Sequence, residues 1–254
     1  MLFDKKELKL MQAVILAGGM GTRLRSVVNN IPKVLAPVEG RPFLAWILDE
    51  LVLDGFNNIC LATGYLGNQI FTAFGNSHRC DGRIASIVYS HENESLGTGG
   101  AIRLALHQLS DKPTFVLNGD TFLRPDWYRM SALHTEQNSH LTIAVRQVED
   151  ISRYGGIEID DGGIVSFNEK KRKGPGFINA GVYLLDSSIF KSIPQSIKTF
   201  SLEKDVIEAN LRKLKPCSFV TDSPFLDIGI PEDFLYAPKF LSAHCRSYHT
   251  FGIT

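Results

Sequence analysis

Three glycines that directly follow an apolar run give the first chemical signal in this 254-residue chain. The run from Ala13 to Leu16 is apolar on both faces, which is typical of a buried parallel strand. Gly18, Gly19 and Gly21 come next. Glycine tolerates positive φ and leaves no Cβ between the backbone amides and a ligand. A loop of this kind after a strand can wrap a phosphate group with its N–H donors.

Two cations follow the glycines. Arg23 lies two residues after Gly21, and Lys33 comes ten residues later in a Pro-Lys pair. A triphosphate needs such charges, whereas a tight strand-to-helix turn, the structural alternative, does not. Neither common phosphate-loop motif fits, because Gly21-Thr22-Arg23 lacks the Gly-Lys-Ser/Thr of a P-loop. Leu24 also stands where a dinucleotide fingerprint has its third glycine.

Asp120 is placed to hold a metal ion, and a second aspartate, Asp227, lies in a strand-like run much later in the chain. Asp120 ends the apolar run that starts at Thr114, and Asp227 lies in the short strand-like run 225–229. An aspartate at the carboxyl end of a strand can bind a metal that also binds phosphates, with a turn or helix-cap role as the alternative. The two aspartates are 107 residues apart (227 − 120), so only the fold can bring them together.

A second glycine-rich helix start follows the strand-like run 84–89. It reads Leu-Gly-Thr-Gly-Gly-Ala over residues 96–101, and Glu92 and Glu94 precede it. Because ligands of open α/β sheets bind at the carboxyl edge of the strands, we expect a ligand near this loop, with a flexible helix N-terminus as the alternative. A carboxylate there can accept hydrogen bonds from the N1–H and N2 amino groups of guanine. A solvated loop charge is the alternative for either acid.

Alternating strands and helices must position these residues. Apolar periodicity predicts βαβ units and a parallel sheet through residue 89, and a hairpin over 153–167 with an Asp-Gly-Gly turn. No repeat or linker divides the chain, so we predict a single domain. The expected strands are 13–16, 59–63, 84–89, 114–120, 141–148, 177–185 and 225–229, with a short extended piece at 34–37. The expected helices are 43–53, 64–74, 102–109, 125–134, 201–214 and one that begins at 231.

The composition argues against several functional classes. The formal net charge is +0, which predicts no general attraction to nucleic acid or to an anionic membrane. No apolar run approaches the roughly 20 residues of a bilayer span, and segment 1–10 is too charged for a signal-peptide core. The four cysteines are scattered, which predicts reduced thiols in a cytoplasmic protein. The seven histidines lack metal-ligand spacing, so we expect them to be structural or exposed.

The Gly-Gly-x-Gly-Thr-Arg loop with its later Pro-Lys pair closely resembles the signature of the sugar-1-phosphate nucleotidylyltransferases. Asn118-Gly-Asp120 and Asp227-Ile-Gly229 resemble further elements of this family, and the resemblance runs from residue 11 to about 241. It implies a Rossmann-like three-layer α/β/α fold with a mixed, mostly parallel sheet and a small β-rich sugar-binding subregion. It also implies that a sugar 1-phosphate reacts with an NTP to give an NDP-sugar and pyrophosphate, with Mg²⁺ as cofactor.

The same resemblance assigns roles to individual residues. Arg23, Lys33 and Asp120 would be catalytic, and Asp120 and Asp227 would bind Mg²⁺. The nucleotide would contact Leu16, Ala17, Gly18, Gly19, Gly21, Thr22, Glu92, Glu94, Gly97 and Thr98. The sugar phosphate would contact Asn118, Gly155, Glu169, Lys170 and Asn179. For Lys170, which begins the run Lys-Lys-Arg-Lys, a solvated surface role is the alternative. The single domain 1–254 would have a nucleotide-binding half (11–150), a sugar-phosphate-binding half (151–240) and terminal extensions (1–10 and 242–254).

Within the family, segments 40–43, 96–103, 116–122 and 227–234 are most similar to guanylyltransferases acting on D-glycero-α-D-manno-heptose 1-phosphate. GTP and this heptose phosphate are therefore the expected substrates. A mannose-1-phosphate guanylyltransferase or a glucose-1-phosphate thymidylyl-, cytidylyl- or uridylyltransferase is the alternative. From other classes, a non-catalytic regulatory subunit that binds nucleotide sugars and a dinucleotide-dependent oxidoreductase are the rivals. The sequence also permits a homo-oligomer.

Overall fold

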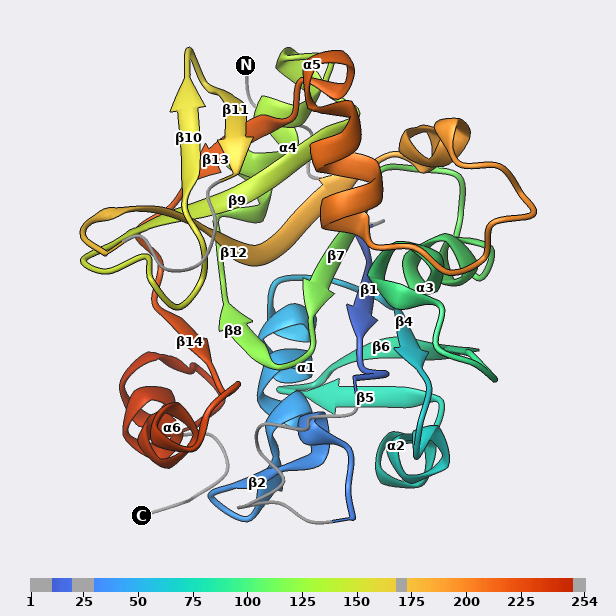
Figure 1. Ribbon diagram of the computed structural model, residues 1–254. Helices are drawn as coiled ribbons and strands as arrows, with labels where there is room; N and C mark the ends of the chain where they lie inside the picture. The colour runs from blue at the N-terminus through green and yellow to red at the C-terminus, as the bar shows by residue number, and fades with distance from the viewer. Residues whose placement is uncertain (1–10, 20–29, 168–172, 249–254) are drawn as a thin grey trace.

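A mixed β-sheet runs through the whole molecule in the computed structural model, which describes residues 11–19, 30–167 and 173–248. Within these residues the sheet has ten strands, in the order β10-β11-β13-β9-β12-β7-β1-β4-β6-β5 (Figure 1). Both predicted halves of the chain contribute strands to it. The mixed α/β architecture expected from the sequence is therefore confirmed.

The parallel part of the sheet contains the strands that follow one another in the first half of the chain. β1 (Gln12–Leu16) pairs in parallel with β4 (Asn58–Thr63) and β7 (Thr114–Asn118), and β4 pairs in parallel with β6 (Arg83–His91). Alternate residues of β1 face opposite cores, with Ala13 and Ile15 on one side and Val14 on the other. Both faces of these strands are thus buried, as their continuous apolar runs predict.

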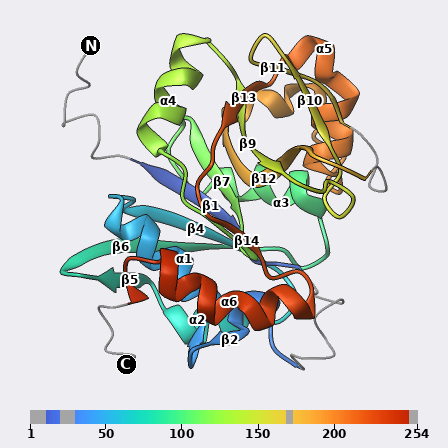
Figure 2. The same cartoon turned by 90° about the vertical axis from the view of Figure 1, so that its left-hand side faces the viewer.

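Helices cover both faces of the parallel strands and make three layers. Side chains of α1 (Phe43–Leu53), α4 (Trp127–Glu136) and α6 (Pro231–His244) belong to one core cluster, together with Ile70 of α2 (Gly67–Phe74). Side chains of α3 (Gly97–Leu106) belong to the other core cluster. Figure 2 shows α1 and α6 on one side of β4 and β6 and α3 on the other. None of the helices in the described part of the chain has the length and apolar character that a bilayer span requires.

The rest of the sheet contains more antiparallel strand pairs than the sequence predicts. β12 (Gly176–Leu185) lies antiparallel between β7 and β9 (Leu141–Val148), and β13 (Cys217–Val220) pairs in parallel with β9. The predicted hairpin is present as β10 (Ile157–Asp160) and β11 (Gly163–Phe167). A second hairpin, β5 (Ser77–Cys80) with β6, was missed. Its Asp81-Gly82 turn has positive φ at both residues, as two-residue hairpin turns require.

Two short ribbons complete the strands. β8 (Thr121–Leu123) pairs with β14 (Phe225–Asp227) between the main sheet and α6 (Figure 1), and β2 (Pro37–Val38) pairs with β3 (Arg41–Pro42). The piece predicted as extended before β2 instead begins with a 3₁₀ turn, Lys33–Leu35.

The segment predicted as one helix over 201–214 is irregular. It contains a π-helical turn (Leu202–Ile207), a 3₁₀ turn (Glu208–Asn210) and the single-turn α5 (Leu211–Leu214). The predicted cap is present, because the hydroxyl of Ser201 accepts a hydrogen bond from the N–H of Lys204 at 3.2 Å. Another 3₁₀ helix, Ser187–Ser192, follows β12.

The residues after α6 pack on α1, so the predicted extension 242–254 is corrected over its described part. Residues 242–244 complete α6. The Arg246 guanidinium bonds to the carboxylate of Glu50, which is 5% exposed, at 2.7 Å, and to Asp54 at 2.8 Å. The ring of Tyr248 stacks on that of Trp46, with 5.5 Å between centroids.

Candidate active site

A cavity of about 440 Å³ lies at the carboxyl edge of β1, β4 and β7. Residues from the first glycine loop, the second glycine loop, the Pro-Lys turn and the ends of β7 and β14 meet there. The lining residues are Leu16, Gly18, Gly19, Lys33, Val34, Ala62, Glu92, Ser95, Gly97, Thr98, Ala101, Asn118, Asp120, Glu203 and Gly229. Separate sequence signals therefore converge on one concave surface at the edge where α/β sheets bind ligands.

The described glycines of the first loop have different environments. A Cβ on Gly18 would lie 2.9 Å from Oε1 of Glu92, so glycine at this position allows that carboxylate to approach the loop. A Cβ on Gly19 would meet no atom of the described residues within 4 Å. Oε2 of Glu92 accepts a hydrogen bond from the N–H of Leu96 at 3.0 Å, which holds the carboxylate in the cavity wall.

Lys33 lies between the two aspartates that the sequence analysis paired. Its ammonium nitrogen is 2.6 Å from Oδ2 of Asp120 and 3.9 Å from Oδ1 of Asp227. The Lys33 side chain is only 10% exposed, whereas those of Asp120 and Asp227 are 35% and 27% exposed. The ammonium thus reaches the carboxylates from inside the protein, and the carboxylates border the solvent.

Strand pairing explains how Asp120 and Asp227 meet. Asp227 ends β14, which pairs with β8 so that Asp227 lies opposite Thr121. The N–H of Ile228 donates to the carbonyl of Asp120 at 3.0 Å, and the N–H of Gly229 donates to Oδ1 of Asp227 at 2.7 Å. Backbone hydrogen bonds therefore hold the two residues side by side and orient the carboxylate of Asp227.

The glycines of the second loop allow close packing against the backbone of residues 198–200. A Cβ on Gly97 would lie 2.6 Å from the carbonyl oxygen of Phe200, and one on Gly100 would lie 2.2 Å from that of Lys198. The hydroxyl of Thr98 is already engaged, because it accepts from the N–H of Leu202 and donates to Glu203, both at 2.9 Å. The sequence interpretation of this loop as a nucleotide contact thus misses its second function, which is to receive residues 198–203.

Some predicted site residues lie off the cavity wall. Glu94 is exposed, and Ala17 is buried with its N–H bonded to the carbonyl of Ala62. Gly155 has φ +84° and follows Tyr154, whose ring packs edge-on against Phe225 of β14. The amide of Asn179 donates to the hydroxyl of Tyr183 at 2.7 Å and accepts from the N–H of Gly181 at 3.0 Å. The predicted residues Gly21, Thr22, Arg23, Glu169 and Lys170 lie outside the described residues.

Sequence reasoning missed one charged residue of the cavity wall, Glu203. The segment Ser201-Leu-Glu-Lys-Asp205 reads as a capped helix start, and that interpretation is correct for Ser201 but gives Glu203 no role. Only the packing of residues 198–203 against α3 places the carboxylate in the cavity.

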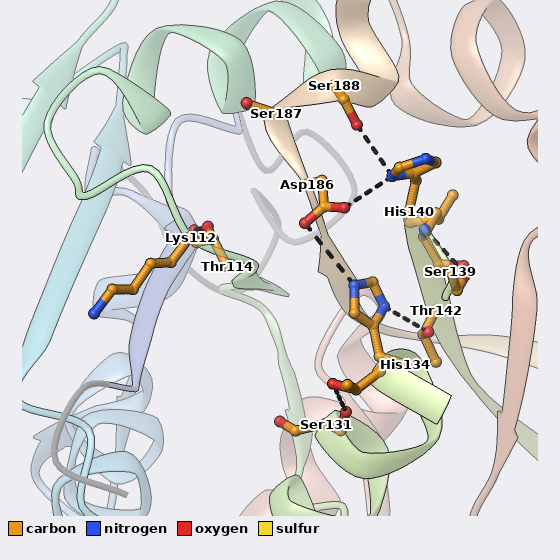
Figure 3. Close-up of polar contacts among 12 residues, drawn as sticks. Lys112, Thr114, Ser131, His134, Ser139, His140, Thr142, Asp186, Ser187 and Ser188 are labelled. Atoms are coloured by element: carbon orange, nitrogen blue, oxygen red, sulfur yellow. Dashed lines mark hydrogen bonds and ion pairs between the residues drawn. The ribbon is translucent and has the colours of Figure 1, made fainter. Parts of the chain in front are cut away.

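The most connected histidines lie away from the cavity. In Figure 3, the carboxylate of Asp186 lies between two imidazoles, 2.9 Å from Nδ1 of His140 and 4.0 Å from Nε2 of His134. His134 is buried and its Nδ1 lies 2.9 Å from the hydroxyl of Thr142. The hydroxyl of Ser188 approaches the same Nδ1 of His140 that contacts Asp186, so these residues do not form a Ser-His-Asp triad.

The cysteines are poor candidates for nucleophiles. All four are buried free thiols. Burial raises the pKa of the Cys60 thiol to about 12, which keeps it in the unreactive protonated form at neutral pH.

Comparison with known proteins defines the class. The nucleotidyl transferase family matches residues 12–244, and the chain belongs to this family. It is 39% identical over 231 residues to a D-glycero-alpha-D-manno-heptose 1-phosphate guanylyltransferase of Aneurinibacillus thermoaerophilus, covering 91% of this chain and 98% of that protein. A protein of the same name from Campylobacter jejuni is 39% identical over 227 residues, with 89% and 98% coverage.

A solved structure agrees with this assignment. HddC from Yersinia pseudotuberculosis, complexed with GMP-PN, is 35% identical and superposes with a TM-score of 0.75, covering 91% of this chain and 99% of that one. A UDP-glucose pyrophosphorylase of Acinetobacter baumannii is only 18% identical but has a TM-score of 0.76, so it shares the fold.

Proposed function

We propose that this protein joins GTP to D-glycero-α-D-manno-heptose 1-phosphate and releases pyrophosphate. The similarity to heptose 1-phosphate guanylyltransferases along nearly their whole length supports the choice of both substrates. The observation that carries nucleotidyl transfer is the position of Lys33 and Asp120 in one cavity with the first glycine loop. Asp227 lies beside them, 3.9 Å from the Lys33 ammonium. We also propose a cytoplasmic location, in keeping with the four free thiols.

We propose Mg²⁺ as the cofactor, held by Asp120 and Asp227. The fit rests on the ammonium of Lys33, which lies within 4 Å of both carboxylates and therefore marks a position that a cation can occupy. Paired carboxylates with phosphate oxygens form the all-oxygen environment that Mg²⁺ prefers. When bound, the ion would neutralise the charge that develops on the phosphates.

The protein residues would act by positioning and by charge. A phosphate oxygen of the sugar attacks the α-phosphorus of the NTP in line, and pyrophosphate leaves. Because the attacking group is already an anion, no general base is needed. The difficulty is to bring two anions together, and fixed cations reduce it. Lys33 would bind the triphosphate, Arg23 the leaving phosphates and Lys170 the sugar phosphate.

Glu92 is our candidate for recognition of guanine. Of the two acids considered in the sequence analysis, Glu92 lines the cavity and Glu94 does not. Its Oε2 accepts from Leu96, and its Oε1 lies against Gly18 at the wall of the cavity. A carboxylate held in this way can accept hydrogen bonds from guanine N1–H and the N2 amino group, which adenine, uracil and thymine do not present together.

The test is pyrophosphate release with Mg²⁺ from GTP, ATP, CTP, UTP and dTTP, each combined with heptose, mannose and glucose 1-phosphates. We expect turnover with GTP and the heptose phosphate. Turnover with GTP and mannose 1-phosphate would replace the sugar and keep the class. A similarity to a mannose-1-phosphate guanylyltransferase catalytic subunit of Drosophila pseudoobscura supports that alternative. The two proteins are 34% identical over 88% of this chain, which is only 60% of the length of the Drosophila protein. Nucleotide binding without pyrophosphate from any pair would favour the regulatory subunit instead.

A further inference from the structure

The carboxylate of Glu203 is the charged group of the cavity wall to which no reaction step has been assigned. It belongs to the π-helical turn Leu202–Ile207, and the backbone before this turn is tied to α3. The N–H groups of Gly99 and Gly100 donate to the carbonyl of Phe200 at 3.0 and 3.3 Å, and the N–H of Phe200 donates to the carbonyl of Leu96 at 3.0 Å. The position of Glu203 is therefore set by backbone hydrogen bonds.

Three hydroxyl groups donate to this carboxylate. Oε1 accepts from Tyr183 at 3.0 Å, and Oε2 accepts from Thr98 at 2.9 Å and from Ser201 at 3.0 Å. A carboxylate has about four acceptor positions, so one remains, on Oε1. Only a hydrogen-bond donor can take it. An anionic phosphate cannot, because two negative charges at this distance repel each other.

Asn179 fixes the direction of the Tyr183 hydroxyl. The Asn179 amide donates to the hydroxyl oxygen at 2.7 Å, so the hydroxyl proton is directed to Glu203. Burial, followed by the charge of Glu203, raises the pKa of Tyr183 well above its usual value. Tyr183 therefore stays a donor at all working pH values. Among the described residues, these contacts leave Glu203 with one acceptor position, and its side chain lines the cavity.

We propose that Glu203 recognises a carbohydrate hydroxyl of a bound substrate by accepting a hydrogen bond from it. This inference rests on the proposed function, which places two carbohydrates in the cavity: the sugar of the sugar 1-phosphate and the ribose of the NTP. The hydroxyl is the shared chemistry. The connection of Glu203 to Tyr183 and Asn179 of β12 favours the sugar 1-phosphate, because Asn179 is the residue that the sequence analysis assigned to the sugar phosphate.

The experiment compares Glu203→Gln with the wild type and with Glu208→Gln, a control at an exposed glutamate of the same segment. Each protein is assayed with the sugar 1-phosphate and its monodeoxy analogues, and with GTP and 2′- and 3′-deoxy-GTP. For the wild type, one deoxy analogue should lose about tenfold to a hundredfold in kcat/KM, as expected for a hydrogen bond to a charged group. Glu203→Gln should lose most of this discrimination and raise KM for the intact substrate. Glu208→Gln should behave as the wild type.

The deoxy analogue that is affected identifies the carbohydrate that Glu203 contacts. Loss of discrimination among sugar analogues assigns the hydroxyl to the sugar, and loss between GTP and a deoxy-GTP assigns it to the ribose. Full wild-type discrimination by Glu203→Gln for every analogue would overturn the proposal. Tyr183→Phe provides a second variant, in which discrimination should fall partially because Glu203 loses its orienting donor.

A binding measurement separates this proposal from the proposed function. Calorimetry with the NDP-sugar and its deoxy analogues needs no turnover. If the wild type binds them with the expected discrimination, Glu203→Gln loses this discrimination and neither protein releases pyrophosphate, the proposed reaction is wrong and the role of Glu203 stands. If turnover is normal and discrimination in Glu203→Gln is unchanged, the proposed reaction stands and the role of Glu203 is wrong.

Discussion

The ammonium nitrogen of Lys33 lies 2.6 Å from Oδ2 of Asp120, although 87 residues separate the two in the chain. The contact is formed because the 3₁₀ turn Lys33–Leu35 and the end of β7 meet at one edge of the sheet. The same ammonium is 3.9 Å from Asp227. Lys33 thus neutralises the pair of carboxylates to which we assign the metal, and an incoming cation must compete with it.

Replacement of Lys33 by methionine should separate these two effects. Activity should fall by about a hundredfold or more, because a cation that stabilises the phosphates is lost. Binding of Mn²⁺ to the nucleotide-free protein should become tighter, since the competing charge is gone. Electron paramagnetic resonance measures free Mn²⁺ directly. Lys239→Met, at an exposed position of α6, is the matched control and should leave both quantities unchanged. Weaker Mn²⁺ binding by Lys33→Met would contradict the competition.

Asp227→Ala and Arg23→Ala should each lower kcat by about a hundredfold or more, equivalent to roughly 3 kcal/mol of transition-state stabilisation. Asp227→Ala removes a proposed metal ligand. Arg23→Ala removes a positive charge that would bind the leaving phosphates; Arg23 lies outside the described residues. Steady-state pyrophosphate release is the measurement. If both variants keep rates within a few-fold of the wild type, the assignment of the site is wrong.

Arg246→Met should lower the free energy of unfolding by about 1.5–3 kcal/mol, the range for a hydrogen bond to a charged group. The guanidinium bonds to the buried carboxylate of Glu50 at 2.7 Å, and Arg124 approaches that carboxylate only to 3.5 Å. Urea unfolding followed by circular dichroism gives the value. Arg212→Met, at an exposed position of α5, should change it little. Equal effects of the two substitutions would show that the contact contributes nothing specific.

The stability of the protein should fall as the pH drops below about 6.5, the usual pKa of histidine. Burial lowers the pKa of His134 and His140 lowers it further, while the charge of Asp186 opposes the shift. Because the folded state then binds fewer protons than the unfolded state, the contribution is complete above the unfolded pKa. It is lost as the pH falls toward the folded pKa.

A pH series of thermal unfolding tests this assignment with His134→Gln, which should flatten the slope below about pH 6.5. The control is His107→Gln, at the exposed histidine that follows α3. A slope unchanged by His134→Gln would assign the pH dependence to other groups.

Apolar periodicity predicted most of the fold, because long regular elements have strong patterns. The helix at 43–53 and the strand at 141–148 have the predicted bounds. β5, with the sequence Ser-His-Arg-Cys, has no apolar alternation and was missed, although its Asp-Gly turn was visible. The irregular turns of 201–214 could not be predicted either, because they depend on packing against α3.

Site residues that lie at the end of a predicted strand could be brought together from the sequence. Asp120 and Asp227 come together because the strands that carry them were predicted correctly, whereas the 3₁₀ turn that begins at Lys33 was expected to be extended. Glu203 is different, since its role depends on a hydrogen-bond network contributed by β12 and α3. Likewise, both loops are glycine-rich in sequence, but in the fold Gly100 provides room for the backbone of Lys198, whereas a Cβ on Gly19 would contact none of the described residues.

The place of β12 between β7 and β9 has a consequence for synthesis. A nascent chain that has reached residue 150 contains β7 and β9 but not the strand that joins them. Until residue 185 leaves the ribosome, β7 has an open edge, and open edges pair readily with other chains. Fragments that end before β12 should therefore aggregate, and we expect that residues 11–150 do not form a stable unit by themselves.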